Sequence, residues 1–146
     1  MKKFIIAFAV ASTLITTTAF AGSKYGDNPA QITFQKEFKG AEDVKWSEGR
    51  EVISASFTLS NSRIVAYFNY SGELLGTARN VLFNQLPLAV IREINNRFGS
   101  APVYDIIEYT CGTETFYNMG IDTSTKHLKL KVTSDGSISV EQKTKK

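Results

Sequence analysis

Apolar and polar residues alternate along several stretches of this chain, and the clearest alternation lies at residues 51–60, EVISASFTLS. A period of two is typical of a β-strand that buries one face and leaves the other in water. The apolar set of this stretch is Ile53, Ala55, Phe57 and Leu59. Similar patterns predict further strands at about residues 64–70, 103–110, 115–121, 127–133 and 137–142.

Two other segments carry apolar residues at helical spacing. The first has Asn28 and Pro29 as an N-cap and a first helical residue. Phe34 and Phe38 follow on one helical face, and Gly40 supplies a stop. The second segment has a proline near its start, an apolar face and a terminal glycine, in the order Pro87, Val90, Ile91, Ile94, Phe98 and Gly99. Each segment is predicted to form a short amphipathic helix.

The order helix, strand, strand, hairpin occurs twice, in about residues 28–82 and 84–142. Each copy ends in a hairpin signal, a small polar residue followed by glycine, with Gly72 in the first copy and Gly136 in the second. Because any two β-hairpins look somewhat alike, chance similarity is the alternative. The predicted fold class is α+β, a tandem repeat of a helix plus antiparallel strands, with the helices packed on one face of the sheet and the other face open.

The first residues have the parts of a secretory signal peptide. Lys2 and Lys3 precede an apolar run over 4–14, and Ala19-Phe20-Ala21 forms a cleavage site, which predicts a leader over 1–21. A membrane anchor is the alternative, but the apolar run is shorter than the roughly 20 residues of a span. No cysteine follows the cleavage point, which argues against a lipoprotein. We expect a periplasmic or secreted protein with no membrane insertion after cleavage.

Charge gives little support to a nucleic-acid partner. The chain carries 17 Lys and Arg against 14 Asp and Glu, a net charge of +3, and removing Lys2 and Lys3 leaves 15 against 14, or +1. No basic stripe with interleaved aromatic residues occurs, so nucleic-acid binding is not expected. Without its 21-residue leader the chain of 146 residues has 125, over 22–146, which suits a single domain.

Side chains that commonly carry catalysis or bind metals are sparse. His127 is the only histidine, and it alternates in phase with Lys129 and Lys131, so we expect it on a solvated strand face. Cys111 is the only cysteine, and a buried inert thiol is favoured over a reactive one. A metal site needs several convergent ligands, and neither a Gly-x-Ser-x-Gly motif nor a phosphate-binding glycine loop occurs. We therefore predict no catalytic residue, metal, cofactor or enzymatic activity.

Four stretches carry the marks of a known family: FQKEFKGAEDVKW, ASFTL, IVAYFNYSGELLGT and LPLAVIREINNRF. They hold a Phe-x-x-x-Phe helix, a Val-x-Trp strand, an aromatic strand that ends at Gly and a Leu-Pro helix start. Together they resemble the PepSY-like family of small exported bacterial proteins, which are described as similar to beta-lactamase-inhibitor protein. The resemblance implies tandem α+β repeats with one open sheet face. In the inhibitor protein that face grips an enzyme, and PepSY modules are proposed to regulate peptidases.

The open face of such a sheet supplies candidate binding residues. If the helices cover the face that holds Phe57 and Phe68, the opposite face is rich in Ser, Tyr and Asn, as binding surfaces are. The candidate partner-binding residues are Ser54, Ser56, Thr58, Tyr67 and Asn69, joined from the second half by Tyr117 and Met119. The alternative is that Tyr and Thr simply suit a half-exposed sheet.

The predicted function is an exported, non-enzymatic binding module. It would hold a protein or peptide of the cell envelope on its open sheet face, as an inhibitor or regulator of a protease or another enzyme. The alternative is a small-ligand carrier or enzyme with an apolar pocket between helices and sheet. That alternative loses its site if the space is filled by Phe34, Phe38, Phe57, Phe68, Ile94 and Phe98.

Overall fold

The computed structural model describes residues 28–146, so the predicted leader over 1–21 lies outside the described residues. These residues form two α-helices, one 3-10 turn and eight strands. In chain order they are α1 (Pro29–Glu37), β1 (Glu42–Glu48), β2 (Ile53–Leu59), β3 (Ser62–Phe68), β4 (Leu74–Asn80), η1 (Phe83–Gln85), α2 (Leu88–Phe98), β5 (Val103–Cys111), β6 (Glu114–Asp122), β7 (Lys126–Thr133) and β8 (Ile138–Lys145). No helix in this part of the chain combines the length and apolar character needed to cross a membrane.

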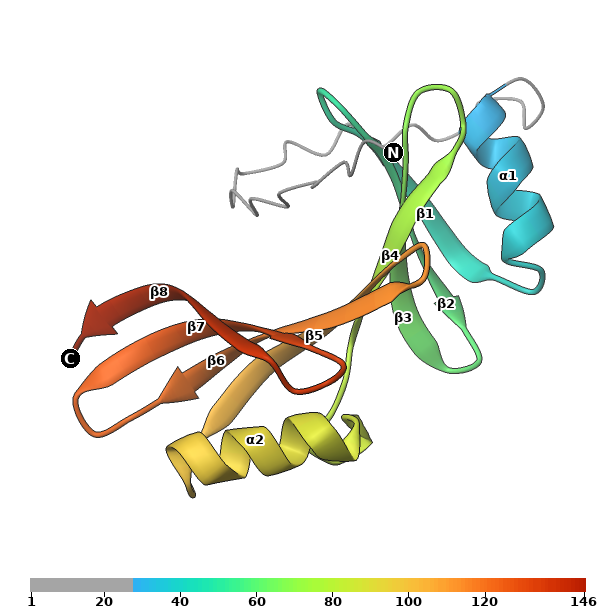
Figure 1. The fold of residues 1–146 in the computed structure, drawn as a ribbon. Helices are drawn as coiled ribbons and strands as arrows, with labels where there is room; N and C mark the ends of the chain where they lie inside the picture. The colour runs from blue at the N-terminus through green and yellow to red at the C-terminus, as the bar shows by residue number, and fades with distance from the viewer. Residues whose placement is uncertain (1–27) are drawn as a thin grey trace, which may run out of the picture.

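All eight strands belong to one antiparallel sheet, in the order β1 to β8 along the chain. The sheet is strongly twisted, so β1–β4 and β5–β8 run in clearly different directions in Figure 1. α1 lies beside the first four strands and α2 beside the last four (Figure 1). Short connections join the antiparallel neighbours except between β4 and β5, where η1 and α2 intervene, and every inner strand is hydrogen-bonded on both edges.

The predicted fold class, a tandem repeat of a helix plus antiparallel strands, is wrong. β4 pairs with β5 through Thr77–Thr110 and three further residue pairs, so the strands continue across the middle of the chain as a single sheet. Residues 28–146 contain two α-helices against eight strands, so the sheet dominates the fold. Period-two alternation identifies a strand with one buried face, but it carries no information on which strand lies next to it.

The two predicted helices are confirmed, and local signals explain where they begin. The side chain of Asn28 caps α1 by accepting a hydrogen bond from the backbone N–H of Ala30 at 2.9 Å, and Pro29 is the first helical residue. α2 begins at Leu88, directly after Pro87. The turn between β3 and β4 contacts α1 at Gly72, where φ is +87° and a Cβ would come within 2.5 Å of Pro29. Only glycine fits there without strain.

Two hydrophobic clusters hold the helices on the sheet. Under α1 the cluster is aromatic, with the Phe34 ring 4.9 Å from that of Phe57 and 5.2 Å from that of Trp46. Under α2 it is mostly aliphatic. Its most deeply buried members include Val90, Ile94, Ile121, Leu130 and Val132. Burial of this apolar surface is what keeps each helix in place.

Both clusters lie on the same face of the sheet. The pairing register carries that face from Ala66 to Thr77, then to Thr110 and Thr115, two residues before Tyr117 in the second cluster. We call this side, with Phe57, Phe68, Tyr117 and Leu130, the covered face. The other side, which no described helix covers, is the open face, and it includes Ser56, Val65, Ala78, Tyr109 and Phe116.

Candidate functional site: the open sheet face

Strand register places a continuous row of side chains across the open face. Each residue of the row is directly opposite the next in the hydrogen-bonded ladder, so neighbouring side chains lie roughly 4.5–5.5 Å apart at Cβ. The row crosses seven strands and consists of Lys45, Ser56, Val65, Ala78, Tyr109, Phe116 and Thr133. The middle of this row is apolar and aromatic, and its ends are polar.

Aromatic rings occupy the centre of the open face. Tyr109 of β5 stacks on Phe116 of β6, with ring centroids 5.1 Å apart and planes 12° from parallel. The ammonium group of Lys131 lies 4.0 Å above the Phe116 ring, in cation–π geometry. Tyr67 of β3 belongs to the next row, opposite Ser54 and Gly76. Burial raises the pKa of both Tyr67 and Tyr109 above the ordinary tyrosine value.

A hollow of about 160 Å³ opens on this face. Its lining combines the rings of Tyr67 and Tyr109 with apolar residues of the central strands and with the Arg63 side chain. The full lining is Arg63, Val65, Tyr67, Ala78, Arg79, Asn80, Ile107 and Tyr109. Ligand pockets are usually about 300–1,000 Å³. This hollow therefore suits one protruding side chain of a partner better than a whole small molecule.

Four of the residues predicted from the sequence meet on the open face. Ser54 lies opposite Tyr67, while Ser56 and Thr58 continue along β2 on the same side. Asn69 lies instead in the turn after β3. Its Oδ1 accepts hydrogen bonds from the backbone N–H of Glu73 at 2.9 Å and from the hydroxyl of Ser71 at 2.7 Å. Asn69 therefore shapes the turn, and its role in partner binding stays a prediction.

The placement of Tyr117 and Met119 on the open face is wrong. Both point to the covered face and lie in the α2 cluster, with only 4% and 3% of their surface exposed. They pair with Val132 and Leu130, two fully buried residues of β7. The error is one of strand phase. β6 has aromatic residues at consecutive positions, 116 and 117, so alternation alone does not say which one is buried.

Sequence reasoning also missed Tyr109 and Phe116, the stacked pair at the centre. The register of β5 shifts between Tyr104 and Ile107, and this irregularity interrupts the period of two. Apolar residues at both 106 and 107 hide the phase further. A hairpin alignment of β5 with β6 across the turn at Gly112 is the one sequence signal that would have put Tyr109 opposite Phe116.

The covered face has its own polar site, between the two hydrophobic clusters. The guanidinium of Arg79 donates to Glu108 at 2.6 Å, and the Glu108 side chain is only 16% exposed. This hydrogen bond raises the pKa of Arg79. Burial, followed by the charge and hydrogen bond of Glu108, raises the pKa of the neighbouring Tyr117. The three side chains satisfy one another, so this site is structural in character.

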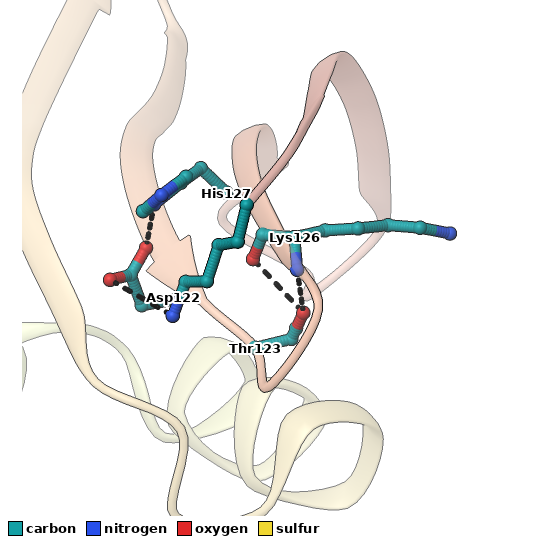
Figure 2. A network of polar contacts seen from close by, with 5 residues as sticks. Asp122, Thr123, Lys126 and His127 are labelled. Carbon is teal, nitrogen blue, oxygen red and sulfur yellow. Dashed lines mark hydrogen bonds and ion pairs between the residues drawn. The ribbon is translucent and has the colours of Figure 1, made fainter.

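Figure 2 shows a polar network at the turn from β6 to β7. Asp122 contacts the imidazole of His127 and lies 3.6 Å from the ammonium of Lys146. Thr123 closes the turn by donating to the carbonyl of Lys126 at 2.9 Å and accepting from its N–H at 3.0 Å. Burial raises the pKa of Asp122, but His127 and Lys146 outweigh it and hold the pKa below its ordinary value.

This network does not assemble a metal site or a catalytic triad. Within residues 28–146, no group of three or more His, Cys, Asp or Glu side chains could hold a metal ion. His127 is 46% exposed at its side chain and points along the open face from β7. A wider hollow of about 540 Å³ next to the network is lined by the end of α2, the loop after it and the turn. The ion pair of Asp122 with Lys146 connects the β6–β7 turn to the residue that follows β8.

Comparisons with known proteins show the fold. No protein-family model matches the chain, and no curated protein matches its sequence. A solved DUF2874 family protein of Bacteroides ovatus is similar with a TM-score of 0.70 at 18% identity, covering 85% of this chain and 89% of that one. A BLIP-like protein of Bacteroides fragilis gives 0.69 at 17% identity, covering 85% and 89%. A Bacteroides eggerthii protein assigned to the periplasm by inference gives 0.69 at 15%, covering 83% and 89%.

At these identities the likeness establishes a shared, BLIP-like fold and nothing further. It supports the part of the predicted resemblance that concerned beta-lactamase-inhibitor protein. The PepSY part of the resemblance continues to rest on the sequence motifs alone.

Proposed function

We propose that this chain is an exported, non-enzymatic binding module that holds a protein or peptide of the cell envelope on its open sheet face. The observation that carries the proposal is the contrast between the faces. Both helices pack on the covered face through hydrophobic clusters. No described helix lies on the open face. Its paired strands place aromatic, hydroxyl and cationic side chains next to one another.

The construction of the open face favours binding. Its side chains project from a hydrogen-bonded sheet, so little conformational entropy is lost when a partner arrives. Phe116 is partly exposed and stacks on the Tyr109 ring, which is itself only 6% exposed, so Phe116 offers a rigidly held aromatic surface of the kind that dominates interface energies. The adjoining hollow can receive one anchoring side chain, and Ser54, Ser56 and Thr58 offer hydroxyl groups beside it.

The fold likeness to a BLIP-like protein supports a more specific form of this proposal. In that form the bound partner is an enzyme, such as a protease, and the module inhibits or regulates it. The leader pattern over 1–21 and the periplasmic assignment of one structural neighbour support a periplasmic or secreted location. A shared fold does not imply a shared partner, so binding itself is tested first.

The space between helices and sheet gives no support to the carrier or pocket-enzyme alternative. Phe34, Phe57, Phe68 and Ile94 are buried between helices and sheet, and Phe38 and Phe98 pack against them. The space in which a ligand would lie is therefore filled by side chains. The two hollows described above lie on the open face and at the end of α2.

Partner capture with variants of the open face tests the proposal. Tyr67→Ala combined with Phe116→Ala removes two aromatic side chains from the open face. We expect the purified variant to lose, by at least tenfold, the envelope proteins that the wild-type protein retains, as measured by quantitative mass spectrometry. The melting temperature should fall only modestly: neither residue belongs to a core cluster, although truncating Phe116 removes its stacking contact with the buried Tyr109 ring.

Leu88→Ala is the matched control, since it also removes an exposed apolar side chain, 70% accessible at the start of α2. This control should capture what the wild type captures. An unchanged set of captured proteins with the double variant would contradict the proposal.

A further inference from the structure

Two cations flank the aromatic centre of the open face. Arg63 of β3 lines the hollow and donates from Nη2 to the hydroxyl of Ser56 at 3.3 Å. Lys131 of β7 lies on the far side, with its ammonium 4.0 Å above the Phe116 ring. Both side chains are therefore held in place by neutral groups, a hydroxyl and an aromatic ring.

Neither cation has an anionic partner within residues 28–146. No carboxylate of these residues lies within 4.0 Å of Arg63 or Lys131, and the same holds for Lys45 and Lys129 on the same face. The covered face is different, because Arg79, one strand away from Arg63, is paired with Glu108 at 2.6 Å. Arg79 on the covered face therefore has a carboxylate partner. Four cations of the open face, Lys45, Arg63, Lys129 and Lys131, have none within 4.0 Å in the described residues.

The acidic residues of the open face lie toward its margins. Glu42 and Glu114 are each the first residue of a strand, and Asp122 is the last residue of β6, where His127 and Lys146 contact it. Glu141 occupies the irregularity in β8, at the edge of the sheet, and its charge contributes to the raised pKa of Tyr109. Glu141 is thus the acidic residue whose charge reaches the hollow, while Arg63 and Lys131 beside it have no carboxylate within 4.0 Å in the described residues.

We propose that the open face recognises an acidic peptide segment of its partner, with carboxylates that pair with Arg63 and Lys131 and an apolar or aromatic side chain between them that enters the hollow. The proposal deepens the proposed function and rests on it. Charge-assisted hydrogen bonds to Arg and Lys are about twice as strong as neutral ones. Unpaired cations also steer acidic partners toward the face and reject basic ones.

Strand spacing sets the distance between the two carboxylates. Arg63 and Lys131 are four strands apart, which is roughly 19 Å for a flat sheet at about 4.8 Å per strand. No single carboxylate spans that distance. An extended segment rises about 3.3 Å per residue, so two acidic residues about six positions apart span that distance. The Arg and Lys side chains are long and flexible, so spacings of four to six positions are within reach of both cations.

A nucleic acid is the competing class of ligand, since it also combines anionic groups with rings that stack on aromatic side chains. The peptide is favoured because the cations are few and Arg63 is separated from Lys131 by the uncharged residues Asn80, Ile107 and Asn118, whereas a phosphate backbone needs a continuous basic track. The hollow also matches one side chain in size.

Fluorescence anisotropy with synthetic peptides tests the inference on the purified protein. The probes carry one Phe between two Glu residues spaced four or six positions apart in a Ser/Gly background, and matched probes replace both Glu by Gln or by Lys. We expect at least one Glu probe to bind at least tenfold more tightly than its Gln and Lys counterparts, with an advantage that shrinks as salt is raised. Arg63→Gln with Lys131→Gln should abolish the advantage.

Lys36→Gln on α1 is the matched control, because it removes an exposed cation away from the open face, and it should leave binding unchanged. Equal binding of the Glu, Gln and Lys probes, no binding by either Glu probe, or displacement by a single-stranded oligonucleotide at lower concentration would each overturn the inference.

Failure of the inference is distinguishable from failure of the proposed function. If the Tyr67→Ala, Phe116→Ala variant loses its captured proteins while the charge variant keeps them, the open face binds a partner that is not acidic. If both variants keep them, the open face is not the binding surface.

Discussion

Residues of the same type have different neighbours on the two faces of this sheet. Tyr117 on the covered face is 4% exposed and shares Glu108 with Arg79, whereas Tyr67 on the open face lines a hollow beside Arg63. Arg79 has a carboxylate partner and Arg63 has a hydroxyl. The difference shows that residue type does not indicate a binding role here. What differs is the surroundings of each side chain: the covered face pairs Arg79 with Glu108, although the buried Trp46 Nε1 has no hydrogen-bond partner there among the described residues, and the open face gives Arg63 only a hydroxyl.

The largest effect should come from truncating a ring on the covered face. Phe57 is fully buried, so Phe57→Ala removes its contacts with Phe34 and Phe38 and leaves a cavity. We expect the free energy of unfolding to fall by about 3–5 kcal/mol, measured by urea titration. Ser56→Ala, one residue away on the open face, should change it by less than about 0.5 kcal/mol. Similar losses for both variants would contradict the assignment of faces.

A smaller loss should follow from separating the ion pair on the covered face. Glu108→Gln keeps the shape of the side chain but removes its charge, which weakens the hydrogen bond with Arg79. Arg79 is 47% exposed at its side chain, so solvent screening reduces the effect, and we expect a loss of about 1 kcal/mol. A double-mutant cycle with Arg79→Gln should give a coupling energy of similar size. A coupling energy near zero would show that the pair contributes nothing to stability.

The smallest effect should appear at the β6–β7 turn, as a dependence of stability on pH. The folded protein holds the pKa of Asp122 below its ordinary value, so the contacts with His127 and Lys146 stabilise the fold above pH about 4. This contribution is lost as the pH falls further and the carboxylate becomes protonated. We expect the difference in urea midpoint between wild type and Asp122→Asn to shrink from pH 5 to pH 3. A difference that grows toward low pH would reverse the assigned direction of the pKa shift.

Local signals explain why both helices were predicted correctly from the sequence. They also explain why only part of the open face was predicted. Asn28 and Pro29 act within one helical turn, so their effect on α1 does not depend on the rest of the chain. The open-face positions of β2 followed from the regular alternation of Ser54, Ser56 and Thr58 with apolar residues. In β5 and β6 the irregularity near Tyr104 and the paired aromatics at 116 and 117 removed that regularity, and Tyr117 and Met119 were assigned to the wrong face.

The sequence by itself determined the two helices, the strands with regular alternation and the hairpin turns, because each depends on contacts between residues close together in the chain. Only the tertiary structure decided that the strands form one continuous sheet through the pairing of β4 with β5. It also brought Arg79 to Glu108, 29 residues later, and placed Lys131 over Phe116. Such pairs form when the covered face buries its apolar side chains, which fixes the register of every strand and so decides which side chains remain on the open face.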